Sequence, residues 1–255
     1  MRKIISYISK INRKPLFILG NPKSGTTIIA NLLSKATKQS LTSDIKSITK
    51  YSPLLLEFEL MNIKGFIKEH AYEFSKDIIK EPSLSFFTDD LLELYTDSKF
   101  VWIVRNPFQN IRSILNRLKI PGNLQKINFD DHIELQKTPA WKLNLQSKMF
   151  GYKSQNYIEA LAFRWSHAFN IYMRNEERIV LVKYEDFLMD KKSFIEKLAV
   201  ELGFSIKDDI SSHVNVQYQP KGNSNIDLKD FFGEKNYSII ETICKENMRK
   251  LGYTS

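Results

Sequence analysis

The sequence predicts the α/β fold class, a three-layer domain with a central parallel sheet between helices. Short apolar runs are nearly continuous in Val, Ile, Leu, Phe and Trp, as in strands covered on both faces of a parallel sheet. Segments with helical spacing of apolar residues alternate with these runs, as in layered α/β proteins. A chain of 255 residues with 42% hydrophobic residues suits a single domain, which we assign to residues 1–255.

Four strands are expected. The first is LFILG at residues 16–20, and the second, DIIKEP at 77–82, has a weaker strand pattern. The third, KFVWIVRNP at 99–107, has the clearest pattern, and the last is RIVLVKYED at 178–186. Helices are expected at residues 27–36, 84–95, 107–118, 158–174, 191–202 and 237–251. Gly203 follows one of these helices as a C-cap.

Two long segments, 119–157 and 211–235, fit neither pattern. Loops of this length in a compact domain are uncommon and usually functional. We therefore expect segment 119–157 to be an insertion or lid on the acceptor side of a binding site. Its aromatic side chains include Phe129, Trp141, Phe150 and Tyr152.

The composition limits the classes of partner and location. The net charge of +9, from 38 Lys and Arg against 29 Asp and Glu, indicates an anionic partner, but the dispersed lysines disfavour a nucleic-acid surface. The single cysteine excludes a disulfide within the chain, and the four histidines lack metal-ligand spacing. Neither a signal peptide nor a membrane-spanning run is visible. We expect a cytoplasmic protein with no metal and no transmembrane segment, and leave its oligomeric state open.

The stretch GNPKSGTT after the first strand predicts a phosphate-binding loop. A strand that turns into a helix directs backbone N–H groups and the positive end of the helix dipole at one point. Gly25 permits an unusual backbone conformation, Ser24, Thr26 and Thr27 add hydroxyl groups, and Lys23 adds a charge. A nucleotide-binding P-loop would carry its lysine directly after the second glycine, whereas here the lysine lies inside the loop.

A second anion site is expected where the third strand ends. Arg105 lies at the carboxyl end of that strand, where ligands bind in open α/β sheets. Ser113 follows eight residues later in the next helix, so that both side chains can reach one phosphate. Taken alone, Arg105 fits a structural ion pair equally well.

Together, the stretch PKSGTT and the later RNP with its serine resemble the sulfotransferase family. The resemblance implies a P-loop-like fold in which residues 23–27 bind the 5′-phosphosulfate of 3′-phosphoadenylyl sulfate (PAPS). It also implies that Arg105 and Ser113 bind the 3′-phosphate of that donor. In two further similar segments, Tyr184 would lie near the adenine, and the 3′-phosphate would be wrapped by Lys221, Gly222 and Asn223.

The resemblance also implies which residues act on the sulfuryl group. Lys80, at the end of the second strand, would touch the sulfuryl group, and Lys23 would stabilise the charge that develops on the leaving phosphate. Many family members have a histidine base two residues after this second lysine, but Pro82 occupies that position here. Glu81 is the nearest replacement and His70 is its rival. Three other carboxylates stay open as bases: Asp44, Glu57 and Glu59.

The expected function is transfer of a sulfuryl group from PAPS to a hydroxyl of a carbohydrate or small-metabolite acceptor. The step would be an in-line displacement assisted by a side-chain base, with adenosine 3′,5′-bisphosphate (PAP) as product. One alternative is a nucleotide-dependent kinase of the P-loop type, although no lysine follows Gly25. The other is a non-catalytic nucleotide-binding module that has lost its base, which Pro82 keeps open.

Overall fold

The computed structural model describes residues 9–45, 62–137, 139–146, 151–216 and 226–254. Its centre is a five-stranded sheet in the order β2-β3-β1-β4-β5, in which every neighbouring pair is parallel. The predicted α/β fold class with a central parallel sheet is confirmed. The strands are β1 (Leu16–Leu19), β2 (Leu41–Ser43), β3 (Ile78–Lys80), β4 (Lys99–Val104) and β5 (Val180–Lys183).

Alternate residues of the central strands supply two hydrophobic cores, one on each face of the sheet. Phe17 and Trp102 belong to the first core, whereas Ile18 and Ile103 belong to the second. All four side chains are buried. Because both faces are covered, both sets of positions must be apolar, and the strand sequences are therefore continuous rather than alternating.

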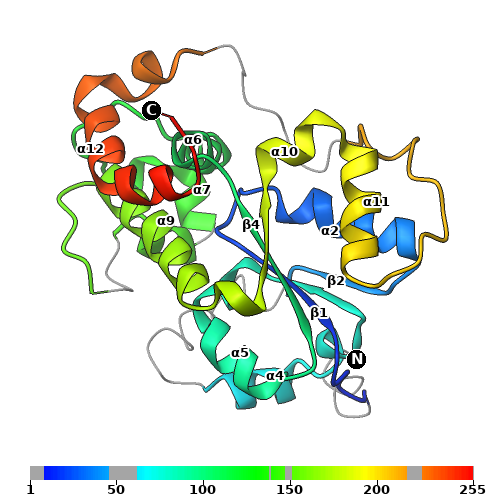
Figure 1. The fold of residues 1–255 in the computed structure, drawn as a ribbon. Helices are drawn as coiled ribbons and strands as arrows, with labels where there is room; N and C mark the ends of the chain where they lie inside the picture. The colour runs from blue at the N-terminus through cyan, green and yellow to red at the C-terminus, as the bar shows by residue number, and fades with distance from the viewer. Residues whose placement is uncertain (1–8, 46–61, 138, 147–150, 217–225, 255) are drawn as a thin grey trace.

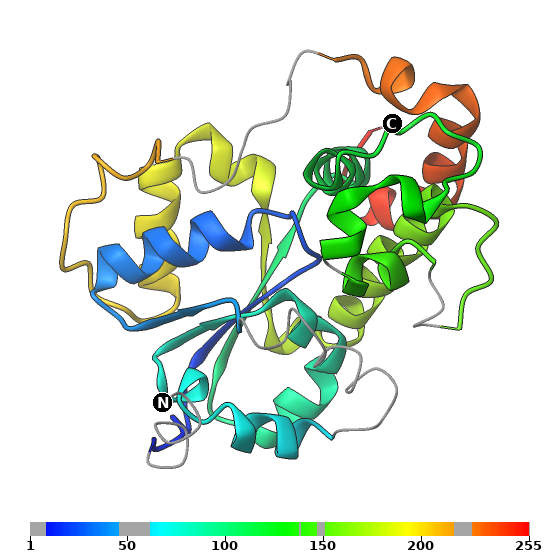
Figure 2. The same ribbon diagram turned by 180° about the vertical axis from the view of Figure 1, so that it is seen from behind.

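The helices form a layer on each side of the sheet (Figures 1 and 2). The first core is covered by α4 (Ile63–Glu69), α5 (Thr88–Leu94), α6 (Pro107–Leu118), α9 (Tyr157–Arg174) and α12 (Leu228–Lys250). The second core is covered by α2 (Thr26–Thr37), α10 (Tyr184–Met189) and α11 (Lys191–Glu201). In Figure 1, α2 and α11 lie to one side of β1 and β4, while α9 and α12 lie to the other.

The fifth strand, β2, was not predicted from the sequence. It is only three residues long, lies at an edge of the sheet, and contains Thr42 and Ser43. The strand forms because Leu41 pairs with Ile78 and because the Thr42 hydroxyl donates to the Glu73 carbonyl at 2.7 Å. These contacts join distant parts of the chain, so no local pattern indicates them.

Two predicted helices have different limits in the structure. The pattern at residues 84–95 divides into a 3-10 helix, η2 (Pro82–Phe87), and the short helix α5. Helix α12 begins at Leu228, well before the predicted residue 237, so the segment 211–235 is not all loop. Gly233 has a non-helical φ of 67° and ψ of 154° inside α12. This kink interrupts the helical spacing on which the sequence prediction depended.

The segment 119–157 contains short helices in its described part. These are η3 (Phe129–Asp131), α7 (Ile133–Lys137) and α8 (Pro139–Asn144). Tyr157 fastens the start of the segment, because its hydroxyl donates to the Pro121 carbonyl at 2.6 Å and accepts from the Leu124 N–H at 3.2 Å. Phe129 and Trp141 pack against the first core, and Phe150 lies outside the described residues.

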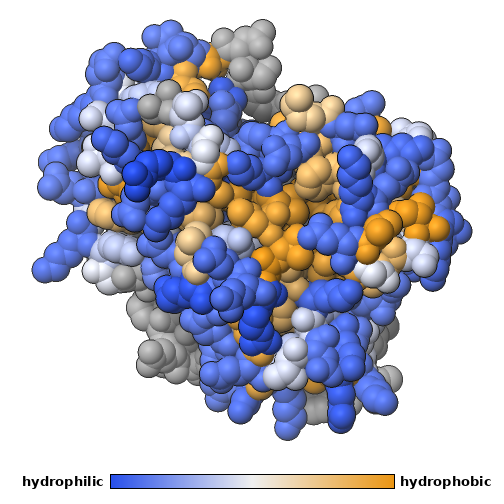
Figure 3. Space-filling model, in the orientation of Figure 1, coloured by the Kyte–Doolittle hydropathy of each residue, from blue (hydrophilic) through white to orange (hydrophobic). Residues whose placement is uncertain are grey.

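Every helix in the described part of the chain is too short or too polar to cross a lipid bilayer. Figure 3 shows an apolar area in the middle of one face, over the region where β5 runs in Figure 1. There Val180 and Leu181 of this edge strand are half-buried. Val200 of α11 and Ile206, which follows this helix, are exposed.

Candidate active site

Several of the predicted donor-binding residues lie at the carboxyl edge of the sheet. The loop 20–25 follows β1, Arg105 follows β4, and Tyr184 begins α10 directly after β5. The Arg105 guanidinium donates to the Lys23 carbonyl at 3.2 Å and lies 5.0 Å from the centre of the Tyr184 ring. Ligands of open α/β sheets bind at this edge.

Two glycines give the loop 20–25 its shape. Gly20 has φ of 136°, and a Cβ atom there would lie 2.2 Å from the Ile103 carbonyl oxygen. Gly25 has φ of 95°, and a Cβ atom there would lie 2.1 Å from the ring of Tyr184. Both positions therefore exclude a larger residue through backbone conformation and through space. The Tyr184 ring rests directly on the end of the loop.

The N-terminus of α2 follows this loop. Its N-cap, Gly25, has no side chain with which to cap the first backbone N–H groups, and its first turn holds no acidic residue. An anion is favoured at such a helix end. Among the predicted hydroxyl donors, Ser24 and Thr26 are buried, at 1% and 2% exposure, while Thr27 is only half-buried. Thr27 is therefore the hydroxyl most open to a ligand.

The charge around Lys23 is strongly positive. Burial and, in decreasing order, the charges of Arg117, Arg105 and Lys80 together lower the pKa of its ammonium group from 10.5 to about 8. Burial likewise lowers the pKa of Arg105. An anionic ligand bound between these groups would stabilise the charged form of each of them.

Ser113 lies on α6, the helix that follows Arg105, and its side chain is half-buried. Residues three and four apart share a helix face, so Ser113 lies on the same face as Asn110 and Arg117. Asn110 contacts the loop 20–25, and the charge of Arg117 acts on Lys23. The face of α6 that carries Ser113 is therefore turned toward the loop.

Asn110 and Ser85 hold the loop 20–25 and were not predicted as site residues. The Asn110 amide donates to the Pro22 carbonyl at 2.9 Å and to the Ser24 hydroxyl at 3.0 Å. The Ser85 hydroxyl accepts from the Gly20 N–H at 2.8 Å. The one available signal was Asn110 itself, a polar residue among the buried positions of an amphipathic helix.

Lys80 pairs with a carboxylate from the neighbouring strand. Its ammonium group lies 2.5 Å from Asp44 Oδ1, and the side chains are 3% and 44% exposed, respectively. Asp44 follows β2 directly and has φ of 64°. The Asp44 N–H also donates to the Lys80 carbonyl at 2.9 Å. The pair thus presents an open carboxylate beside a buried ammonium group.

Glu81 has a different environment from Asp44. One of its carboxylate oxygens accepts from the Ser83 N–H at 2.9 Å, and the other accepts from the Ile45 N–H at 3.0 Å. The residue is buried, and this burial raises the pKa of its carboxyl group. Glu81 is also the N-cap of η2. Both of its oxygens are therefore engaged in holding the backbone.

His70 lies at the C-terminus of α4, ahead of the amino end of β3. It is buried, its ring centre lies 4.5 Å from that of Phe66, and its Nδ1 lies 3.9 Å from a Glu73 oxygen. Burial lowers the pKa of this imidazole. These contacts place His70 in the helical layer, against Phe66 and Glu73.

A chain of contacts links the end of the protein to the Arg105 region. Glu185 accepts from the Asn106 N–H at 3.0 Å and from the Tyr253 hydroxyl at 2.7 Å. The Trp165 indole donates to the Arg105 carbonyl at 2.9 Å. These contacts fix the turn from β4 into α6, and with it the position from which Arg105 extends.

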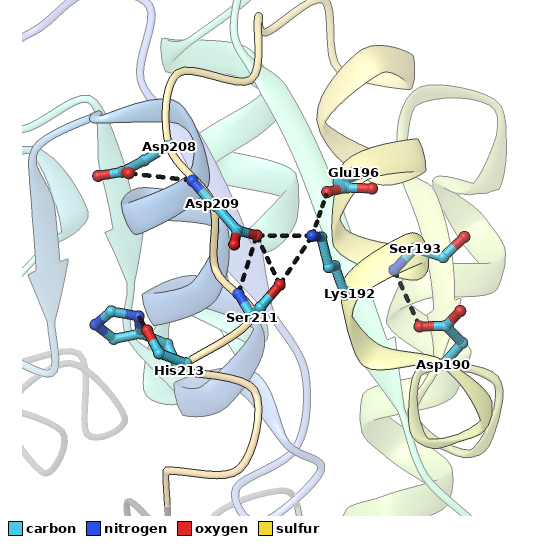
Figure 4. A network of polar contacts seen from close by, with 9 residues as sticks. Asp190, Lys192, Ser193, Glu196, Asp208, Asp209, Ser211 and His213 are labelled. Carbon is cyan, nitrogen blue, oxygen red and sulfur yellow. Dashed lines mark hydrogen bonds and ion pairs between the residues drawn. The ribbon is translucent and has the colours of Figure 1, made fainter.

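Lys221, Gly222 and Asn223 lie outside the described residues. The stretch before them is held to α11 by the network in Figure 4, in which Lys192 contacts Asp209 at 2.7 Å and the Ser211 hydroxyl at 2.8 Å. Figure 4 also shows Lys192 directed at Glu196, 3.9 Å away.

A model described as the sulfotransferase family matches residues 35–208 of the chain. A search of curated proteins returns no match.

Three solved structures illustrate the likeness in fold. Sulfotransferase STF9 from Mycobacterium avium has 13% identity and a TM-score of 0.57, with 98% of this chain and 79% of STF9 covered. Mouse sulfotransferase SULT7A1, complexed with PAP, has 18% identity and a TM-score of 0.52, with 97% and 89% covered. A sulfotransferase from Alicyclobacillus acidocaldarius has 15% identity and a TM-score of 0.51, with 92% and 97% covered. At these identities the likeness concerns the fold.

Proposed function

The chain belongs to the sulfotransferase family, and on this basis we propose that it transfers a sulfuryl group from PAPS to an acceptor hydroxyl. The observation that carries the proposal is the contact between two anion-binding elements, in which Arg105 donates to the carbonyl of Lys23. PAPS carries two separate anionic groups, and two adjoining cationic elements suit such a donor. The mouse relative complexed with PAP supports the same ligand class.

The phosphosulfate would be held by the loop after β1 and the N-terminus of α2, with Lys23 and Thr27 as side-chain donors. Arg105 and Ser113 would hold the 3′-phosphate, because Arg105 adjoins the loop and Ser113 lies on the face of α6 turned toward it. Tyr184, whose ring lies against Gly25, would contact the nucleotide. From the resemblance alone, the 3′-phosphate would also contact Lys221, Gly222 and Asn223.

Bound PAPS supplies the sulfuryl group and a phosphate leaving group. Lys23 would stabilise the charge that develops on the leaving phosphate, and Lys80 would act from the neighbouring strand. Contacts with the Lys23 carbonyl and with Asp44 hold Arg105 and Lys80 before the donor binds, so these two cations need little reorganisation during the reaction.

We propose Asp44 rather than Glu81 or His70 as the base. A base must reach the acceptor hydroxyl, and Asp44 is 44% exposed next to Lys80. Glu81 is buried with both oxygens accepting backbone N–H groups, and His70 packs against Phe66 in the helical layer. The acceptor would enter beside Asp44, and segment 119–157, with Phe129, Trp141 and Tyr152, would cover it. That the acceptor is a carbohydrate or small metabolite, and that the protein is cytoplasmic, are predictions from the sequence.

Isothermal titration calorimetry with PAP tests the donor site. We expect binding in the micromolar range or tighter without Mg²⁺, and no binding of ATP with Mg²⁺ at the same concentrations. Absence of PAP binding at high micromolar concentration would refute the proposal. Selective Mg²⁺-dependent ATP binding would favour the kinase alternative instead.

The base is tested with radiolabelled PAPS and a panel of hydroxylated saccharides and small metabolites. Asp44→Asn should lower kcat by about 10²- to 10⁴-fold while PAP binding is retained. Glu81→Gln is the matched control; it should mainly lower the melting temperature, because an amide cannot replace both acceptors. Full activity in Asp44→Asn would exclude Asp44. PAP binding without transfer to any acceptor would favour the non-catalytic alternative.

A further inference from the structure

We propose that Asn110 is a positioning residue that fixes the loop 20–25 in its anion-binding shape; this inference rests on the proposed donor-binding role of the loop. Asn110 lies in the first half of α6 and is fully buried. Its side chain reaches residues 88 and 86 positions earlier in the chain, Pro22 and Ser24. No local pattern links them.

All the polar groups of the Asn110 side chain have partners in the loop. Its amide NH₂ donates to the Pro22 carbonyl at 2.9 Å and the Ser24 hydroxyl at 3.0 Å. Its carbonyl oxygen accepts from the Asn21 side-chain amide at 2.9 Å. Two donors and one acceptor in one short planar group are supplied by asparagine; aspartate lacks the donors and glutamine is one methylene longer.

The contacts of Asn110 flank Lys23 on both sides. Lys23 has φ of 69°, a left-handed conformation that is uncommon for a residue with a side chain. Pro22 and Ser24 are held by Asn110, and the carbonyl of Lys23 itself accepts from Arg105. Three consecutive loop residues are thus held from the segment that runs from β4 into α6. Such a conformation persists only where its surroundings fix it.

This arrangement couples the two anion-binding elements. Arg105 and Ser113 belong to the same segment as Asn110, and a shift of α6 would move the loop through Asn110. The Asn110 side chain is buried behind the loop, so it acts through Lys23 and the loop backbone rather than by touching the donor. It sets the distance between the group that holds the phosphosulfate and the group that holds the 3′-phosphate.

Asn236 provides a matched control within the same chain. It is also fully buried, its amide donates to the Gly122 carbonyl at 2.8 Å and the Leu124 carbonyl at 3.0 Å, and its carbonyl accepts from Asn156 at 3.3 Å. Its side chain, like that of Asn110, donates two hydrogen bonds and accepts one, but its partners lie in the segment after α6 and at the N-cap of α9. Removing it costs comparable hydrogen bonds without touching the loop 20–25.

The test compares Asn110→Ala, Asn110→Asp and Asn236→Ala by melting temperature and by calorimetric PAP affinity. Both alanine variants should melt lower than the wild type by similar amounts. Only Asn110→Ala should weaken PAP binding, by at least about tenfold, which corresponds to 1.4 kcal/mol. Equal PAP affinity of Asn110→Ala and Asn236→Ala would overturn the proposal.

Asn110→Asp adds a readout that a merely structural role would not change. Its carboxylate cannot donate to Pro22 at pH 8, but its protonated form can. Its PAP affinity relative to that of the wild type should therefore rise as the pH falls from about 8 to about 5, because burial raises the pKa of a carboxyl group. A ratio independent of pH would count against the proposal. This near-isosteric variant also carries the test if the alanine variant does not fold.

Hydrogen exchange separates failure of this inference from failure of the proposed function. If the wild type does not bind PAP, the donor assignment is wrong, but the positioning role is still decided by amide exchange in residues 22–27. We expect faster exchange there in Asn110→Ala than in the wild type and no change in Asn236→Ala. Unchanged exchange in both variants would refute the positioning role.

Discussion

Binding of PAP should take up a proton at Lys23. Burial and three neighbouring cations lower the pKa of this lysine to about 8. A phosphate placed against the ammonium group favours its charged form and raises the pKa again. The free protein is therefore partly neutral at Lys23 near pH 8, and the complex is charged there. Binding must then be accompanied by proton uptake.

The size of the uptake follows from the pKa of the free protein. With a value near 8, about one-tenth of a proton is taken up at pH 7, about half at pH 8 and about nine-tenths at pH 9. The affinity for PAP should fall by about fivefold between pH 8 and pH 9, since the neutral fraction must first be protonated. The phosphates of the ligand titrate near pH 6 and do not contribute in this interval.

Calorimetry in buffers of different ionisation enthalpy measures this uptake directly. At pH 8 to 9 the apparent enthalpy of PAP binding should vary with the buffer, and the slope gives the number of protons. Lys23→Arg is the control, because a guanidinium stays protonated throughout and should bind without uptake. The reasoning is refuted if the wild type shows no dependence on the buffer, or if Lys23→Arg shows the same slope.

Three further substitutions test the site. Arg105→Ala should weaken PAP binding by about 10- to 150-fold, as removal of a charged hydrogen-bond donor does, and wild-type affinity in calorimetry would contradict the assignment. Gly25→Ala should lower both the melting temperature and the PAP affinity, because the new methyl group meets the Tyr184 ring; an unchanged melting curve would show that the loop relaxes freely. His70→Gln should keep sulfuryl transfer within a few-fold of the wild type, and loss of kcat with normal PAP affinity would restore His70 as the base.

The sequence alone predicted the central strands, most helices and the positions of the two cationic elements. These features depend on short-range patterns. A strand covered on both faces is continuously apolar, and the turn from β1 into α2 needs Gly20 and Gly25 at conformations that other residues resist. Lys23 and Arg105 each follow a strand of the parallel sheet, so both lie at its carboxyl edge, where Arg105 donates to the Lys23 carbonyl.

The tertiary structure decided which polar residues support the site. Glu81 and Asp44 are both carboxylates near the end of a strand, and only their contacts distinguish them. Glu81 accepts two backbone N–H groups, whereas Asp44 is the exposed partner of Lys80. The sequence marks Asn110 only as a polar residue among apolar positions of α6, and it cannot indicate its partners, because they lie more than 80 positions earlier in the chain. Side-chain hydrogen bonds between distant segments exist only after the sheet has brought those segments together. The residue types of the loop can therefore be read from the sequence, whereas its conformation depends on contacts that only the tertiary structure forms.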